Sequence, residues 1–95
     1  ETEFTQEALD NLEVKVSNNL SLKYLEFARS YFEDALYYEK KGDYQKAEEF
    51  IFKAIEINPY YAEGYYQLGK INYITGKIEK AERYLKKSIE IVKKF

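Results

Sequence analysis

The 95-residue sequence predicts an all-α protein in which antiparallel helical hairpins stack as a short solenoid of about five helices. The first observation is an internal repeat: with a shift of 34 residues, residues 28–61 align with residues 62–95, and ten of the 34 pairs are identical. The second is that apolar and aromatic residues recur at steps of three and four, the period of a helix buried on one face. The third is that a glycine divides each repeat into two such stretches. A fixed period of this length is typical of helical-repeat proteins.

Residues 28–61 form the first predicted hairpin. Its first helix carries small and aromatic residues at steps of three and four, namely Ala28, Tyr31, Ala35 and Tyr38. Gly42 then suits a left-handed helix end because it has no Cβ, and Asp43 offers an N-cap oxygen to the next helix. The second helix continues the spacing with Tyr44, Ala47, Ile51, Ala54 and Ile55. We expect it to end before Pro59, because proline disfavours helical geometry in the residue before it.

Residues 62–95 repeat this arrangement as a second hairpin, with Gly76 between its helices. The residues expected to face inward are Tyr65, Leu68, Gly69, Ile78, Ala81, Leu85 and Ile89. Small residues occupy matching places in both hairpins, with Ala35 and Gly69 in the first helices and Ala47 and Ala81 in the second. We expect the paired backbones to approach each other closely at these small residues.

Residues 1–27 precede the repeats and are expected to form a helical cap or extension. Thr5 can cap a first short helix. The residues that would share one face of this helix are Ala8, Leu9, Leu12 and Val16. Residues 17–19, Ser-Asn-Asn, indicate a turn. A further helix would then begin near Leu20 or Leu22 and run unbroken to Lys41.

Composition excludes several classes of function. No apolar run approaches the roughly 20 residues of a membrane span, and the acidic start lacks a signal-peptide pattern. Cysteine is absent, so we expect no disulfide and a cytoplasmic protein. The net charge of -2, with 15 basic and 17 acidic residues interspersed, gives no broad field for nucleic acid or an anionic membrane. The charged share of 34%, without His, Met, Cys or Trp, is thermophile-like and equally typical of a designed or excised chain.

The sequence also offers little for catalysis. Without His and Cys, the usual bases and nucleophiles are missing. The carboxylates stand beside cations at helix-supporting spacings such as Glu79/Arg83. Residues 64–70 have the glycine and lysine spacing of a phosphate-binding loop, but Ile71 follows where a Ser or Thr is required. We therefore predict a protein that is not an enzyme and has no cofactor or metal site.

These residues and spacings resemble the tetratricopeptide repeat, a 34-residue helix-turn-helix unit. The residues that carry the resemblance are Tyr31, Ala35, Tyr38, Gly42, Tyr44, Ala47, Ile51, Ala54 and Pro59, and then Tyr65, Leu68, Gly69, Gly76, Ile78, Ala81 and Leu85. Asp34 departs from the pattern where the family has Leu, Asn72 where it has an aromatic, and Lys93 where it has Pro. Lys93 predicts a last helix that runs on without a stop. Residues 7–9 and 24–44 are also similar to an archaeal helical family of unknown function.

The resemblance implies a right-handed superhelix whose first helices line a concave, peptide-binding groove. The groove-facing residues would be Arg29, Phe32, Leu36, Glu39 and Lys40 of the first repeat and Glu63, Tyr66, Lys70, Tyr73 and Ile74 of the second. Family members that clamp a C-terminal carboxylate have Lys and Asn where this sequence has 32–33 Phe-Glu and 66–67 Tyr-Gln, so we expect no such clamp. The aromatic groove suits an apolar or amphipathic protein segment. Alternatively, the N-terminal segment covers its aromatic residues.

The many tyrosines do not indicate nucleic-acid binding. Tyr31, Tyr38, Tyr44 and Tyr65 fit the core of the hairpins. Few cations accompany the aromatic residues predicted for the groove, whereas a nucleic-acid surface needs clustered Lys and Arg among them. We therefore expect no nucleic-acid partner.

The last helix carries more apolar surface than one neighbouring helix can cover. We expect it to contact a second copy or a neighbouring repeat of a longer array. The residues expected in this contact are Leu85, Ile89, Val92 and Phe95. The sequence thus predicts an interaction scaffold that binds a protein or peptide segment and forms a homo-oligomer. The alternative is a structural or designed self-assembling helical-repeat unit without a ligand.

Overall fold

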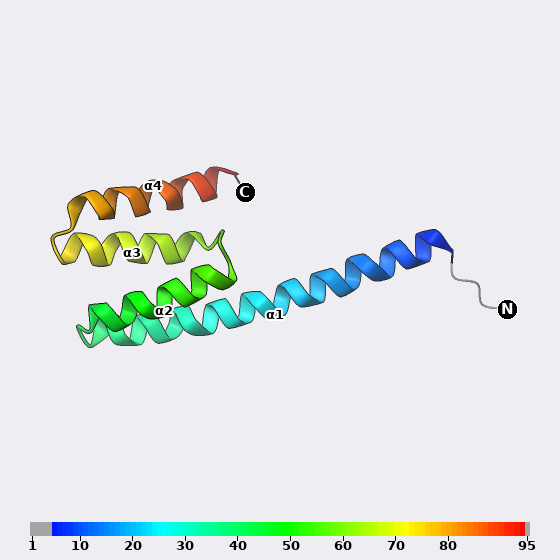
Figure 1. The fold of residues 1–95 in the computed structure, drawn as a ribbon, viewed down its shortest axis with the longest axis horizontal. Coiled ribbons are helices and arrows are strands. Elements are labelled where there is room, and N and C mark those ends of the chain that lie inside the picture. The colour runs from blue at the N-terminus through cyan, green and yellow to red at the C-terminus, as the bar shows by residue number, and fades with distance from the viewer. Residues whose placement is uncertain (1–4, 95) are drawn as a thin grey trace.

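A computed structural model describes the backbone of residues 5–94 and the side chains of residues 5–11 and 25–94. This part of the chain contains four helices and no strand: α1 (Gln6–Lys40), α2 (Tyr44–Ile57), α3 (Ala62–Ile74) and α4 (Ile78–Lys94) (Figure 1). The C-terminal half of α1 pairs with α2, and α3 pairs with α4, so that two helical hairpins lie side by side. The predicted all-α helical-repeat fold is confirmed.

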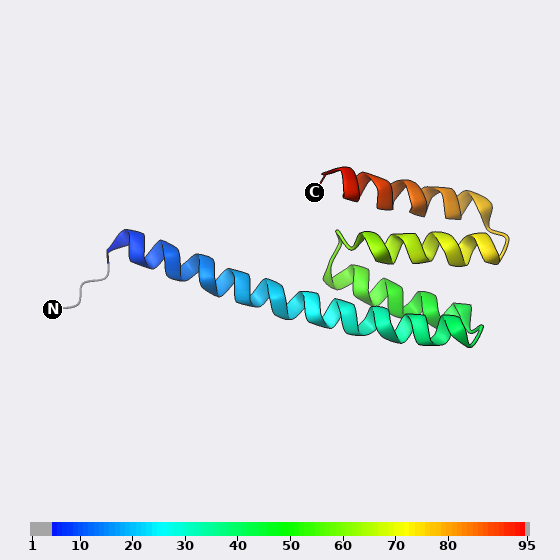
Figure 2. The ribbon, with the colours of Figure 1, turned by 180° about the vertical axis from the view of Figure 1, so that it is seen from behind.

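Helix α1 differs from the sequence-based expectation in one respect. The turn expected at residues 17–19 is not formed, and one helix of 35 residues replaces the two expected in this region. Residues 6–40 contain no glycine or proline, and Ser and Asn lower helix stability by only about 0.5 kcal/mol each relative to Ala. The N-terminal half of α1 therefore continues along the helix axis beyond the hairpins instead of folding over them (Figures 1 and 2).

The two hairpin turns have the same local structure. Gly42 and Gly76 have φ values of 80° and 84°, a left-handed conformation that favours glycine. Each turn is closed by a backbone hydrogen bond from the residue after the glycine, donated by Asp43 N to Tyr38 O (3.0 Å) and by Lys77 N to Asn72 O (2.8 Å). The predicted cap is also present, because Asp43 Oδ1 accepts a hydrogen bond from Lys46 N at 3.2 Å. The 34-residue repeat thus extends to individual hydrogen bonds.

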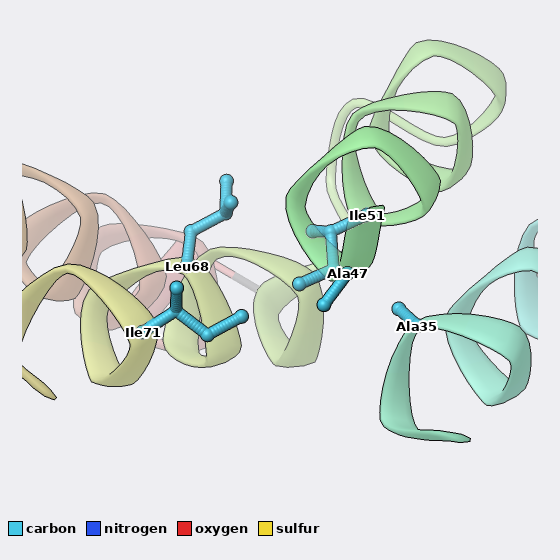
Figure 3. Close-up of a cluster of buried hydrophobic side chains, with 5 residues drawn as sticks. All are labelled: Ala35, Ala47, Ile51, Leu68 and Ile71. Atoms are coloured by element: carbon cyan, nitrogen blue, oxygen red, sulfur yellow. The ribbon is translucent and has the colours of Figure 1, made fainter. Parts of the chain in front are cut away.

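The main core joins three helices. It consists of Ala35 from α1, Ala47 and Ile51 from α2, and Leu68 and Ile71 from α3 (Figure 3). The alanines stand where α1 and α2 approach each other, as their small size predicts, and the larger side chains fill the space between α2 and α3. This core fixes the position of α3 relative to α1, and thereby the surface that the two helices share.

The predicted core tyrosines are half-buried: Tyr38, Tyr44 and Tyr65 pack against this cluster, and Tyr31 packs against a second, smaller core. Tyr38 stacks on Phe50 with ring centroids 5.4 Å apart and an angle of 4°, and Tyr31 lies 6.2 Å from the same ring. Lys53 Nζ lies 5.1 Å from the Phe50 centroid, and Lys46 Nζ lies 5.0 Å from that of Tyr38. These rings pack against one another and against lysines of their own hairpin, so they are structural.

The three departures from the repeat pattern each have a clear structural result. Asp34, in place of a family leucine, is exposed on α1. Asn72, in place of an aromatic residue, is only 1% exposed, and its Nδ2 donates a hydrogen bond of 2.7 Å to Leu68 O. The buried amide is therefore satisfied within its own helix. Helix α4 continues to Lys94, as the missing proline at position 93 predicts.

Candidate functional site

A depression lies between α1 and α3, the first helices of the two hairpins. Its volume is about 340 Å³, which is within the range of sites that take a small ligand or an anchoring side chain. The lining residues are Leu36, Glu39 and Lys40 of α1, Tyr44 of α2, and Gln67 and Lys70 of α3. Because three helices that are fixed by the main core contribute to it, we call this surface the α1–α3 groove.

A hydrogen bond across the floor of the groove ties its two walls together. Gln67 Nε2 donates to Glu39 Oε2 at 2.7 Å, and the Gln67 side chain is 7% exposed. Hydrogen bonds to a charged carboxylate are stronger than those between neutral groups. Lys40 and Lys70 are exposed beside this pair, so the rim of the groove presents cations above a floor of apolar, amide and carboxylate groups.

Only some of the residues that were predicted for the groove lie in it. Leu36, Lys40 and Lys70 line it. Tyr66 and Tyr73, at 50% and 67% exposure, lie on α3 one turn before and one turn after Lys70. Lys70 Nζ lies 5.7 Å from the centroid of the Tyr66 ring, a cation–π distance. Tyr66 therefore lies against the rim of the groove at Lys70, and Tyr73, three residues after Lys70, is exposed on the same side of α3.

Phe32 and Arg29 have other surroundings. Phe32 is buried, at 7% exposure, in a second small core with Ala28 and Ala54. Its ring lies 5.2 Å from that of Tyr61, in the connection between α2 and α3. Phe32 is therefore not on the open surface that the sequence assigned to it. Arg29 is exposed and pairs with Glu33 one turn along α1, with Nε and Oε1 3.5 Å apart.

Tyr61, which packs on Phe32, is a neutral group. Burial raises the pKa of its hydroxyl, and the nearby carboxylate of Glu63 raises it further, whereas Arg29 opposes the shift. The phenol therefore stays protonated and packs on Phe32 as an uncharged ring. A similar effect of burial, with Glu48 next in size, raises the pKa of Tyr84 between α3 and α4.

Sequence reasoning missed the Gln67–Glu39 bond and the contribution of Tyr44 to the groove. Both involve contacts between helices, which depend on the angle and distance at which the helices cross. The resemblance to the repeat family placed Glu39 in the groove, but nothing in the sequence indicated which partner it takes.

A second candidate surface is the outer side of α4. Ile78, Ile89 and Val92 are 46%, 54% and 67% exposed. Leu85 is half-buried because it packs against Gly69 of α3. Phe95, which was predicted for the same contact, lies outside the described residues. We call Ile78, Leu85, Ile89 and Val92 the α4 face.

The remaining features do not indicate a catalytic or metal centre. A depression of about 490 Å³ is lined only by residues 76–83, a single stretch at the start of α4, so no second element encloses it. Among the side chains that the structure describes, no group of three or more carboxylates is arranged to hold a metal ion. In the same part of the chain, no helix has the length and apolar character needed to cross a bilayer.

Comparisons with known proteins agree with the repeat architecture. The tetratricopeptide repeat family matches twice, over residues 28–61 and over residues 62–95. The crystal structure of MamA is similar, with a TM-score of 0.70 and 29% sequence identity over 94% of this chain. The chain spans about half the length of that protein, since 49% of MamA is covered. A search of curated proteins found no match. With two family matches that together cover residues 28–95, the chain belongs to the tetratricopeptide repeat family.

Proposed function

We propose that this protein is a protein–protein interaction scaffold and that it holds an amphipathic segment of a partner protein in the α1–α3 groove. The observation that carries the proposal is the depression between the two first helices, with Leu36 in its lining and Tyr66 and Tyr73 exposed beside it. An apolar side chain of the partner would enter the depression, and its neighbours would lie across the two tyrosines. Short amphipathic helices commonly bind grooves in this way.

The cations at the rim of the groove suggest that the partner segment is negatively charged. Lys40 and Lys70 stand at the edge of the groove, whereas the carboxylate of Glu39 is engaged by Gln67. A partner segment with carboxylates on both sides of its apolar face would meet these two cations. Complementary charge of this kind sets orientation and association rate more than affinity.

Selection from a peptide-display library, followed by fluorescence anisotropy with the selected peptides, tests this proposal. We expect the selection to yield acidic amphipathic peptides. These peptides should bind the wild type at least tenfold more tightly than they bind the variant Tyr66→Ala/Tyr73→Ala. Both tyrosines are exposed, so the variant should keep the wild-type circular dichroism spectrum. Tyr37→Ala is the matched control, because Tyr37 is 54% exposed on α1 outside the groove. Equal binding by wild type and double variant would contradict the groove assignment.

Self-association through the α4 face is a second candidate function. Its support is the exposure of Ile89 and Val92 on one side of the same helix. Contiguous apolar surface of this kind commonly marks a contact with another protein. Sedimentation equilibrium over a concentration series measures the association.

A further inference from the structure

The α4 face corresponds to a surface that is covered elsewhere in the same molecule. On α2, Ile55 and Ile51 receive Gly64 of α3 so closely that a Cβ on this glycine would lie 3.2 Å from Ile55 Cγ1 and 3.7 Å from Ile51 Cγ2. One repeat later, these two isoleucines correspond to Leu85 and Ile89 of α4. Ile55 is half-buried by its contact, whereas Ile89 is 54% exposed. The α4 face is therefore the counterpart of the surface on which α2 receives α3.

The first hairpin of a second copy does not pack on the α4 face in the way that α3 packs on α2. Helix α3 packs on α2 through Gly64, Leu68 and Ile71, all of which are buried. Their counterparts one repeat earlier are Ser30, Asp34 and Tyr37, all of which are exposed on α1. Repeat-on-repeat stacking would place the carboxylate of Asp34 where Leu68 is fully buried. Burying an unpaired charge is strongly unfavourable, so this edge of the molecule is closed to stacking.

Pairing of two α4 helices is opposed by charge. Helix α4 contains six cations and three carboxylates, which gives it a net charge of +3. Two such helices side by side would carry a combined net charge of +6, and an excess of like charge opposes association. The α4 face therefore favours a helix with a net negative charge.

The N-terminal end of α1, residues 6–11, has the required charge and exposure. Residues 5–11 contain Glu7 and Asp10 and no cation, and Leu9 among them is 46% exposed. This part of the helix projects beyond both hairpins (Figures 1 and 2). In the sequence, Ala8 precedes a leucine by four residues, the same spacing of small residue and leucine as Gly64 and Leu68 in the helix that α2 holds.

We propose that the α4 face binds the projecting N-terminal part of α1 from a second copy of the chain. The contact is heterologous, because each copy contributes a donor helix at one end and an acceptor face at the other. This inference rests on the proposed self-association and names the surfaces that make it.

Complementation between two single variants tests the inference. Ile89→Glu blocks the acceptor face and leaves the donor helix intact, whereas Leu9→Glu blocks the donor helix and leaves the acceptor face intact. Both side chains are about half exposed, so both variants should keep the wild-type circular dichroism spectrum. We expect each variant alone to sediment as a monomer at concentrations where the wild type associates. An equimolar mixture should form a heterodimer, because one intact donor meets one intact acceptor.

Each other outcome has a definite meaning. If Leu9→Glu associates as the wild type does, or if the mixture stays monomeric, the α1–α4 contact is wrong although self-association stands. A wild type that stays monomeric up to millimolar concentration overturns both this inference and the proposed self-association, and leaves the groove proposal untouched. Tyr37→Glu is the control for an added charge, because Tyr37 is exposed on α1 outside both surfaces, and it should associate like the wild type.

Discussion

Gly69 lies where Leu85 and the backbone of α4 approach α3 closely. A Cβ on this residue would lie 2.6 Å from Leu85 Cδ2 and 2.7 Å from Leu85 Cγ, and 3.3 Å from the backbone oxygen of Ala81. The leucine cannot withdraw by bending only its tip, because its Cγ is also too close. The glycine is therefore required by the packing of the second hairpin, and its place in the middle of a helix, where glycine is unfavourable, is explained.

Gly69→Ala should lower the free energy of unfolding by about 1–2 kcal/mol. Overpacking costs roughly 1–3 kcal/mol, and replacing a helical glycine by alanine returns up to about 1 kcal/mol. Gly64→Ala is the matched control, because its added Cβ would meet only isoleucine side chains, the nearest atom at 3.2 Å. We expect Gly64→Ala to be neutral or slightly stabilising. Guanidinium denaturation followed by circular dichroism measures both, and an equal change in the two variants would disprove the packing argument.

Phe32 shows what the sequence could not predict at this scale. The resemblance to the repeat family assigned it to the groove together with Leu36, which lies four residues further along α1. Its burial depends on Tyr61, whose ring lies 5.2 Å away in the connection between α2 and α3. The path of that connection is set by tertiary packing, and no periodicity within α1 indicates it. Leu36, which no connection covers, lines the groove as predicted.

At the scale of helices, the caps and turns were predictable because they depend on local chemistry. Thr5 Oγ1 accepts a hydrogen bond from Ala8 N at 3.1 Å, and Asp43 makes the equivalent bond at the start of α2. The two left-handed glycines are likewise where the sequence places them. The continuity of α1 through residues 17–19 was not predictable, because Ser and Asn favour turns only modestly and a helix without glycine or proline tolerates them.

The two caps should have different effects on stability. Asp43→Ala removes a cap inside the first hairpin, and we expect a loss of about 1 kcal/mol in the free energy of unfolding. Thr5→Ala removes the same kind of bond from the projecting end of α1, where residues 5–11 are exposed. It should reduce helix content at that end and leave the main unfolding midpoint unchanged. Thermal denaturation monitored at 222 nm separates the two effects, and a shift of the midpoint by Thr5→Ala would show that the projecting helix is part of the cooperative unit.

The whole molecule is elongated, with dimensions of 67 × 26 × 14 Å, and its two edges are unlike. One edge has Ser30 and Asp34 exposed where a preceding repeat would pack, and the other has the apolar α4 face. The surplus of apolar surface on the last helix was predictable from its composition. The chemistry of the first edge became clear only when Leu68, the counterpart of Asp34, was found fully buried. The effect of a residue at an exposed edge can thus be inferred from the contacts of the equivalent residue in the other repeat.

Extending the array tests whether the α4 face receives a helix in the way that α2 does. A second copy of residues 62–95 appended after Phe95 would place a new first helix on α4, with Gly64 of the copy opposite Ile89. Stability in repeat arrays is approximately the sum of repeat and neighbour-interface terms. We therefore expect a higher guanidinium midpoint and a steeper dependence of unfolding free energy on denaturant, because more surface is exposed on unfolding. The matched control carries Leu68→Asp in the appended copy only, which reproduces the charge of Asp34 at the new interface. It should lose most of the gain in midpoint, and equal gains from both extended chains would show that α4 does not receive a helix in the way that α2 does.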